Sequence, residues 1–277
     1  MKKNLYSITV FCCIIAFLFS ACELFKMDNY DEPAETLKGE VTDIATGERV
    51  LTDQSSNGIR IRIRELSWTE TAPTNFDFYC MKEGFFQNTK VFKGDYNVRI
   101  DGPFIPLVRI NQRGDTLADE SKYIHIKGVA VQNFQVQPFL RIEWVEKPYL
   151  DATDTIRASI RVLRGVSATD FKAKIEPMGG WNDNFLDVTD IRFFISESAY
   201  VGYTDSQSTP YQRTYSFTGN DFEINSNYGF GNTFALKASG KVPAGRTVFV
   251  RAAARIRYQT EGVSRYNYNE AVRVDIP

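Results

Sequence analysis

The sequence predicts an all-β protein with two consecutive β-sandwich domains behind an N-terminal export signal. Three observations lead to this prediction. Apolar residues recur at every second position through most of the chain after residue 37, which is the period of a strand with one buried face. Turn-forming residues separate these stretches. The chain opens with the charge and hydropathy pattern of a segment that directs export.

The export signal has three parts. Met1-Lys2-Lys3 is basic, residues 5–19 are apolar, and Ser20-Ala21-Cys22 follows. The apolar run is short for a stable membrane span. The ending Phe19-Ser20-Ala21-Cys22 resembles a bacterial lipobox, which implies a lipoprotein signal peptide at residues 1–21 and a lipid on the sulfur of Cys22. The alternative is an uncleaved N-terminal anchor helix.

Charge and cysteine content narrow the possible classes. The chain has 33 Lys and Arg against 34 Asp and Glu, so it lacks the excess of basic residues that a nucleic-acid binder needs. Cys12 and Cys13 would leave with the signal peptide and Cys22 would carry the lipid, so only Cys80 remains. An intramolecular disulfide is then impossible, and the hydrophobic core must hold the fold.

Residues 22–33 are predicted to form a flexible tether, because they are acidic and lack the period of a strand. In some Gram-negative lineages, acidic residues close behind the lipidated cysteine accompany export to the cell surface. Glu23 and Asp28 are compatible with this destination. A solvated linker without a sorting role fits the composition equally well.

The clearest predicted strand is residues 59–64, where three isoleucines alternate with three arginines. The isoleucines should face the core and the arginines the solvent. No stretch of comparable length has a clear helical period. The same alternation recurs at residues 96–100, 156–162, 191–195, 248–252 and 272–276, with turn residues at 46–47, 56–58, 93–94 and 243–245.

Chain length sets the number of domains. Removal of residues 1–21 would leave 256 residues, and one β-sandwich takes roughly 100. Pro138 and Pro148 flank a single strand-like run, so the boundary is placed there. We expect one domain at residues 34–137 and a second at 138–277.

Both domains resemble known modules. Residues 37–48 (LKGEVTDIATGE) and 92–98 (FKGDYNV) resemble two signatures of carboxypeptidase-regulatory-like, transthyretin-like domains. In the second, Gly94 would permit a tight turn and Tyr96 would point inward. Residues 187–197 (DVTDIRFFISE) and 242–254 (VPAGRTVFVRAAA) resemble the middle strands and proline turn of fibronectin type III modules.

With the lipobox and residues 28–33 (DNYDEP), these modules resemble a family of Bacteroidota lipoproteins. Genes of that family commonly neighbour an outer-membrane importer similar to the starch-utilisation importer and its lipoprotein lid. The resemblance implies a lipid-anchored protein of the outer membrane, exposed at the cell surface, that binds glycan as an accessory to polysaccharide uptake. Domain one would be a spacer. The alternative is a structural or interaction subunit of the importer complex with no ligand of its own.

Catalytic motifs are not evident. His125 is the single histidine and lies on the polar side of an alternating strand, and no Gly-x-Ser-x-Gly elbow accompanies it. Cys80 is expected to be a small core residue. The sequence has no phosphate-binding glycine loop and no zinc-ligand spacing. We therefore expect no enzymatic activity, cofactor or metal.

Carboxylates need separate consideration, because glycoside cleavage requires only two acids beside the bond. The closest grouping is Asp183, Asp187, Asp190 and Glu197. Aspartates at the start of a strand are routine turn formers, so no enzymatic role is assigned to them. A calcium site at Asp183 and Asn184 would lack the spacing of a known calcium loop.

The most suggestive stretch for binding is residues 178–185 (MGGWNDNF). A sugar ring can pack its C–H face on an indole while amides and carboxylates bind the hydroxyls. Alternatively, Trp181 folds back as a plug over the sandwich. Trp68 and Trp144 are expected to pack in the core or at its edge. The candidate glycan-binding residues are Trp181, Asn182, Asp183, Asn184, Tyr200, Tyr203 and Tyr228.

Overall fold

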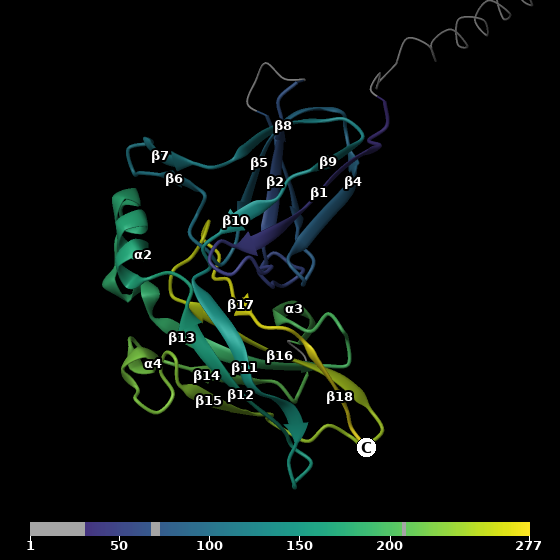
Figure 1. The fold of residues 1–277 in the computed structure, drawn as a ribbon, viewed down its shortest axis with the longest axis vertical. Helices are drawn as coiled ribbons and strands as arrows, with labels where there is room; N and C mark the ends of the chain where they lie inside the picture. Colours follow the sequence, from purple (N-terminus) through teal and green to yellow (C-terminus); the bar gives the residue numbers. More distant parts are fainter. Residues whose placement is uncertain (1–30, 68–72, 207–208) are drawn as a thin grey trace, which may run out of the picture. The chain divides into compact units, whose positions relative to one another are not determined.

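The computed structural model describes residues 31–67, 73–206 and 209–277 (Figure 1). About 47% of the described residues are strand and 9% helix, which confirms the all-β sandwich prediction. Ala34–Pro277 form one compact unit. Within the described ranges, no helix has both the length and the apolar character needed to cross a membrane. The predictions for residues 1–21, Cys22, Trp68 and most of the tether fall outside those ranges.

Two sheets enclose the first core. In one, β1 is central: it pairs antiparallel with β4 and parallel with both β9 and β10. The other has the order β3-β2-β5-β8, and a short hairpin is formed by β6 and β7. The strands are β1 (Glu35–Asp43), β2 (Arg60–Glu65), β3 (Asn75–Tyr79), β4 (Phe85–Val91), β5 (Gly94–Asp101), β6 (Val108–Ile110), β7 (Thr116–Asp119), β8 (Lys122–Ile126), β9 (Val129–Val131) and β10 (Phe134–Val136).

Strand β2 shows why this sequence forms a sandwich. Ile61 and Ile63 are buried in the first core, while the intervening Arg62 lies on the other face. Its guanidinium donates two hydrogen bonds of 2.6 Å to Asp77 on the neighbouring strand β3. This bidentate pair raises the pKa of Arg62 and lowers that of Asp77. The alternation predicted for this stretch is therefore present.

The second sandwich packs a three-stranded sheet, β11-β12-β15, against a five-stranded one. The larger sheet has the order β14-β13-β16-β17, and β18 pairs with β16 beside β17. Both sheets contribute to one large core of buried aliphatic and aromatic side chains. The strands are β11 (Leu140–Leu150), β12 (Ile156–Arg164), β13 (Val188–Ser196), β14 (Arg213–Ser216), β15 (Thr233–Lys237), β16 (Thr247–Ile256), β17 (Asn267–Tyr268) and β18 (Val272–Asp275).

One helix of two turns, α2 (Ala168–Ile175), was not expected from the sequence. The hydroxyl of Ser167 caps it by accepting a hydrogen bond of 3.0 Å from the amide of Asp170. Phe171 and Ile175, four residues apart, are buried in the second core. The remaining helices, each a single turn, are η1 (Glu176–Met178), η2 (Asp183–Leu186), α3 (Tyr203–Ser206) and α4 (Asp221–Ile224).

Arg251 of β16 joins the two sandwiches, although it is almost completely buried. Its guanidinium donates hydrogen bonds to the carbonyl of Thr52 (2.8 Å) and that of Lys82 (3.3 Å) in the first sandwich. It also donates to the carbonyl of Asn269 (2.7 Å) and lies over the ring of Tyr268, 4.3 Å from the centroid. Burial lowers the pKa of Arg251 to about 10, so the group remains charged at neutral pH.

A chain segment before β18 continues this polar interface. The guanidinium of Arg265 donates a hydrogen bond of 2.7 Å to the carbonyl of Ser56. The side-chain amide of Asn267 donates one of 3.0 Å to the carbonyl of Pro103. Asn267 also accepts a hydrogen bond of 3.1 Å from the amide of Leu140. Backbone carbonyls of one sandwich are thus bound by side chains of the other, which fixes their relative position.

Replacing Arg251 by alanine should lower the free energy of unfolding by about 3 kcal/mol, because buried carbonyls lose their donors and a cavity remains. Urea unfolding followed by tryptophan fluorescence and circular dichroism would measure this. We expect the two signals to separate, as the sandwiches begin to unfold independently. Arg273→Ala, which removes only an exposed ion pair with Asp275, should change stability by less than about 0.5 kcal/mol. Equal effects of the two substitutions would contradict the role of Arg251.

Candidate functional site

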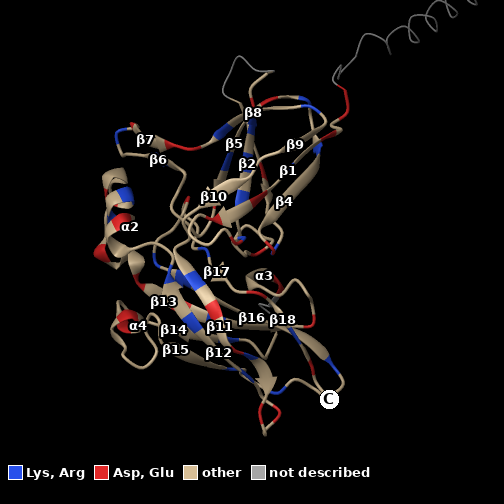
Figure 2. Ribbon diagram, in the orientation of Figure 1, with Lys and Arg blue, Asp and Glu red and all other residues tan. Residues whose placement is uncertain are grey.

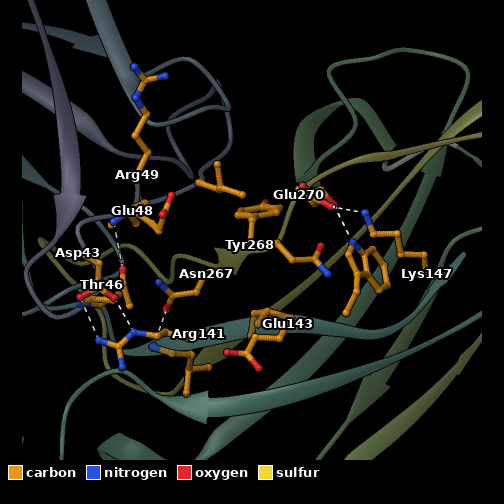
Figure 3. Close-up of a pocket in the computed structure, with 17 residues that line it drawn as sticks. Asp43, Thr46, Glu48, Arg49, Arg141, Glu143, Lys147, Asn267, Tyr268 and Glu270 are labelled. Carbon is orange, nitrogen blue, oxygen red and sulfur yellow. Dashed lines mark hydrogen bonds and ion pairs between the residues drawn. The ribbon is translucent and has the colours of Figure 1, made fainter.

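A cleft of about 410 Å³ lies between the two sandwiches (Figure 3). One wall is formed by the end of β1 and residues 46–51 of the loop that follows it. The other wall is formed by β11 and by residues 267–270. Because the interface described above fixes both walls, the cleft is preformed.

Trp144 forms part of the β11 wall. Its indole is partly buried against the second core, and its Nε1 donates a hydrogen bond of 3.1 Å to the carbonyl of Glu270. The side chain of Glu270 forms an ion pair of 3.0 Å with Lys147 (Figure 3). These contacts hold the ring at the cleft, so Trp144 packs on the core and also lines a surface that a ligand can reach.

At the other end of the cleft, Arg141 and Asp43 link the sandwiches. The two form a bidentate pair, with Nε–Oδ2 and Nη2–Oδ1 distances of 2.5 and 3.0 Å. The pairing raises the pKa of Arg141. Exposed carboxylates of Glu48 and Glu143 lie between the ends (Figure 3). Figure 2 shows that basic and acidic residues are interspersed over both sandwiches.

Asn269 also lines the cleft, and only 4% of its surface is exposed. Its Oδ1 accepts a hydrogen bond of 2.9 Å from the amide of Ala252, which fixes the orientation of the side-chain amide. Its Nδ2 has no hydrogen-bond partner in the described part of the chain. The atom has almost no solvent-accessible surface, so this donor lies behind the surface of the cleft, and its lack of a partner costs stability.

Trp181 lies outside this cleft, in the loop between η1 and η2. Its ring centroid is 6.1 Å from that of Phe171 and 5.8 Å from that of Phe185, and the ring packs against the second core. Lys172 Nζ lies 5.4 Å from the ring centroid, and Nε1 donates to Asp183 at 2.7 Å. This packing resembles the predicted plug. The exposed Asn182 caps η2 by accepting a hydrogen bond from the amide of Asn184.

The three tyrosines predicted to bind glycan lie in three different places, apart from Trp181. Tyr200 is 58% exposed. Tyr203 is stacked 5.7 Å from Tyr266 beside the sandwich interface. Tyr228 packs 5.4 Å from Phe234 at the opposite sheet edge. The ring neighbours of Trp181 are Phe171 and Phe185, so the aromatic residues predicted as one site are divided among separate clusters.

Comparison with known proteins shows which family the chain belongs to. Residues 35–137 match a family model described as "Protein of unknown function (DUF3823) N-terminal domain". A crystal structure of a DUF3823 family protein from Bacteroides uniformis is 51% identical, covers 88% of this chain and 100% of its own, and has a TM-score of 0.83. The chain belongs to the DUF3823 family. The sequence predicts a resemblance to a family of Bacteroidota lipoproteins. The comparisons support this as far as membership of DUF3823, a family with structural neighbours in Bacteroides.

Two more distant structures share the fold of this DUF3823 protein. One, from Bacteroides uniformis, is described as a "putative carbohydrate binding protein"; it is 19% identical with a TM-score of 0.60. The other, a DUF3823 family protein from Parabacteroides merdae, is 16% identical with a TM-score of 0.57. Each comparison covers 88% of this chain and 100% of the other. No curated protein matches the chain.

The titratable residues considered for catalysis are dispersed in the DUF3823 chain. Cys80 is buried, and burial raises the pKa of its thiol. His125 is exposed and lies 2.7 Å from Asp95. Asp190 accepts hydrogen bonds from Arg255 and Tyr266, as a structural carboxylate would. Among the described residues, no group of three or more His, Cys, Asp or Glu could hold a metal ion.

Alkaline pH should destabilise the DUF3823 protein. Burial raises the pKa of Tyr258, which packs against Phe171 and Phe185, to about 12, whereas a tyrosine of the unfolded chain ionises near pH 10. The unfolded state therefore loses this proton first as pH rises. This ionisation should lower the free energy of unfolding between pH 10 and 12.

The variant Tyr258→Phe removes this group at little structural cost, since the hydroxyl has only a 4.0 Å contact with the sulfur of Met178. Between pH 9 and 11 the variant should lose less stability than the wild type, by on the order of 1 kcal/mol. Urea unfolding at the two pH values would measure the difference. The opposite effect of Arg251, whose pKa burial lowers to about 10, is common to both proteins and cancels. Identical losses would show that Tyr258 ionises normally.

Proposed function

We propose that this protein is a lipid-anchored outer-membrane protein, exposed at the cell surface, that binds a glycan as an accessory to a polysaccharide uptake system. It has no catalytic role in this proposal. The principal glycan site is the cleft lined by Trp144. The importer and its lipoprotein lid are the proposed protein partners, and the lipid on Cys22 is the proposed link to the membrane.

The composition of the cleft carries this proposal. It combines the indole of Trp144 with exposed carboxylates and with the exposed cations of Arg49 and Lys147. Sugars need these three groups, because their C–H faces pack on aromatic rings and their hydroxyls both donate and accept hydrogen bonds. The description of the 19% identical Bacteroides uniformis structure as carbohydrate binding agrees in kind with this proposal.

The Trp181 loop is proposed as a secondary contact. Its Asn182, Asp183 and Asn184 are exposed, but the ring of Trp181 is packed against the core and covered in part by Lys172. A sugar would have to displace the lysine before it could stack. Trp144 needs no such displacement in the proposal, and we therefore rank the cleft first.

The two tryptophans can be compared directly. Trp144→Ala should weaken glycan binding at least about tenfold, corresponding to about 1.4 kcal/mol of lost stacking, whereas Trp181→Ala should reduce stability more than affinity. Calorimetry and affinity electrophoresis against a panel of polysaccharides would measure binding. Thermal unfolding would confirm that each variant is folded. Tyr149→Ala is the matched control, since this exposed aromatic residue lies on the same strand but outside the cleft.

Three outcomes would decide between these contacts. Loss of binding in Trp144→Ala alone supports the cleft. Loss in Trp181→Ala alone moves the site to the loop. A wild-type protein that binds no polysaccharide of a broad panel contradicts glycan binding altogether.

Membrane attachment can be tested at Cys22. In the native host, the Cys22→Ala variant should move from the membrane fraction to the non-membrane fraction, because the sulfur that would carry the lipid is gone. Protease treatment of intact cells should degrade the wild-type protein at the surface. Mass spectrometry showing an unmodified Cys22 within a longer N-terminus would contradict the anchor, and full protease resistance would contradict surface exposure.

A second candidate function, an interaction subunit without a ligand, has one observation in its favour. Val129 and Val131 on β9 are 62% and 61% exposed, and such aliphatic pairs favour protein contact. Detergent extracts of the same cells would test it. Copurification of an importer with the wild type but not with a Val129→Ser/Val131→Ser variant, together with no glycan binding, would favour this candidate.

A further inference from the structure

We infer that the Trp144 cleft accepts an uncharged oligosaccharide and excludes acidic ones. The inference rests on the proposed function and makes the ligand class specific. It is carried by the charges that line the cleft and by the partners those charges already have.

Every cation that lines the cleft has a carboxylate partner in the described structure. Arg141 binds Asp43, and Lys147 lies 3.0 Å from Glu270. Arg49 Nε lies 2.6 Å from Glu40 Oε2. A uronate or sulfate entering the cleft would have to displace one of these carboxylates to gain a cation, so its net electrostatic gain would be small.

The carboxylates are less completely paired. Glu48 has no cationic partner among the described residues, and the nearest cation to Glu143 is Arg161 at 3.8 Å. The cleft is lined by four carboxylates, those of Asp43, Glu48, Glu143 and Glu270, and by three cations. These carboxylates would therefore repel an acidic sugar, and the repulsion would weaken its binding relative to that of a neutral sugar. A neutral sugar would donate its hydroxyls to the same carboxylates.

Donors for the oxygens of the sugar remain on the paired cations of Arg49, Arg141 and Lys147. A guanidinium or ammonium that already binds a carboxylate keeps further N–H groups, and a neutral hydroxyl can accept from these without displacing the carboxylate. The ring of Trp144, these donors and the acceptors of Glu48 and Glu143 together match an uncharged sugar.

Affinity electrophoresis against two groups of polysaccharides tests this inference. The neutral group is dextran, laminarin, xyloglucan, galactomannan and yeast mannan; the acidic group is polygalacturonate, alginate and chondroitin sulfate. We expect retardation by at least one neutral polysaccharide and by none of the acidic group, with little change between 50 and 500 mM NaCl. Binding to an acidic polysaccharide that equals or exceeds all neutral binding would overturn the inference and leave glycan binding standing. No binding to either group would overturn both.

Charge variants test whether residues of the cleft exclude acidic polysaccharides. Glu48→Lys should allow retardation by polygalacturonate, while Glu146→Lys, an exposed position of β11 outside the cleft, should not. Equal behaviour of the two lysine variants would overturn the inference.

Discussion

The guanidinium of Arg251 is a positive charge buried between two β-sandwiches and held chiefly by backbone carbonyls. Burying a charge costs several kcal/mol, and here hydrogen bonds to Thr52, Lys82 and Asn269 and the ring of Tyr268 offset that cost. Carbonyl acceptors are fixed to the main chain, so the charge specifies where the backbones of both sandwiches lie. An apolar interface of equal area would tolerate sliding more readily, because apolar contact is not directional.

The hydrogen bonds of Arg251 also fix the geometry of the cleft. Thr52 directly follows Leu51, which lines the first wall, and Asn269 lines the second. A single side chain therefore holds the main chain of both walls. Ligand binding to a preformed cleft avoids the cost of ordering loops. This matters for sugars, whose individual contacts are weak because each hydroxyl exchanges bonds with water for bonds with protein.

The sequence reveals the strands well and the site poorly, for one physical reason. Period-two alternation reports which residues are apolar, so residues 59–64 could be placed correctly. It cannot report that a second sandwich covers the polar face of a strand, as happens at Arg251. Helix α2 is too short to show a period. The sequence predicts that Trp144 packs in the core or at its edge, and the ring does pack there but also lines the cleft. The glycine and asparagine neighbours of Trp181 favour an exposed loop, yet its ring packs against the core. The signal for Trp144 was Pro148 and the run of polar residues beside it, typical of an edge strand.

Strand β1 gives the molecule a mechanical property. Its first residues follow the N-terminal segment, its last residue, Asp43, lines the cleft, and hydrogen bonds to β4 on one edge and to β9 and β10 on the other flank it along its length. A pull between Glu35 and Asp43 acts along this strand. Such a load shears many hydrogen bonds at once instead of opening them one after another. The topology thus gives the first sandwich resistance to a force applied along β1.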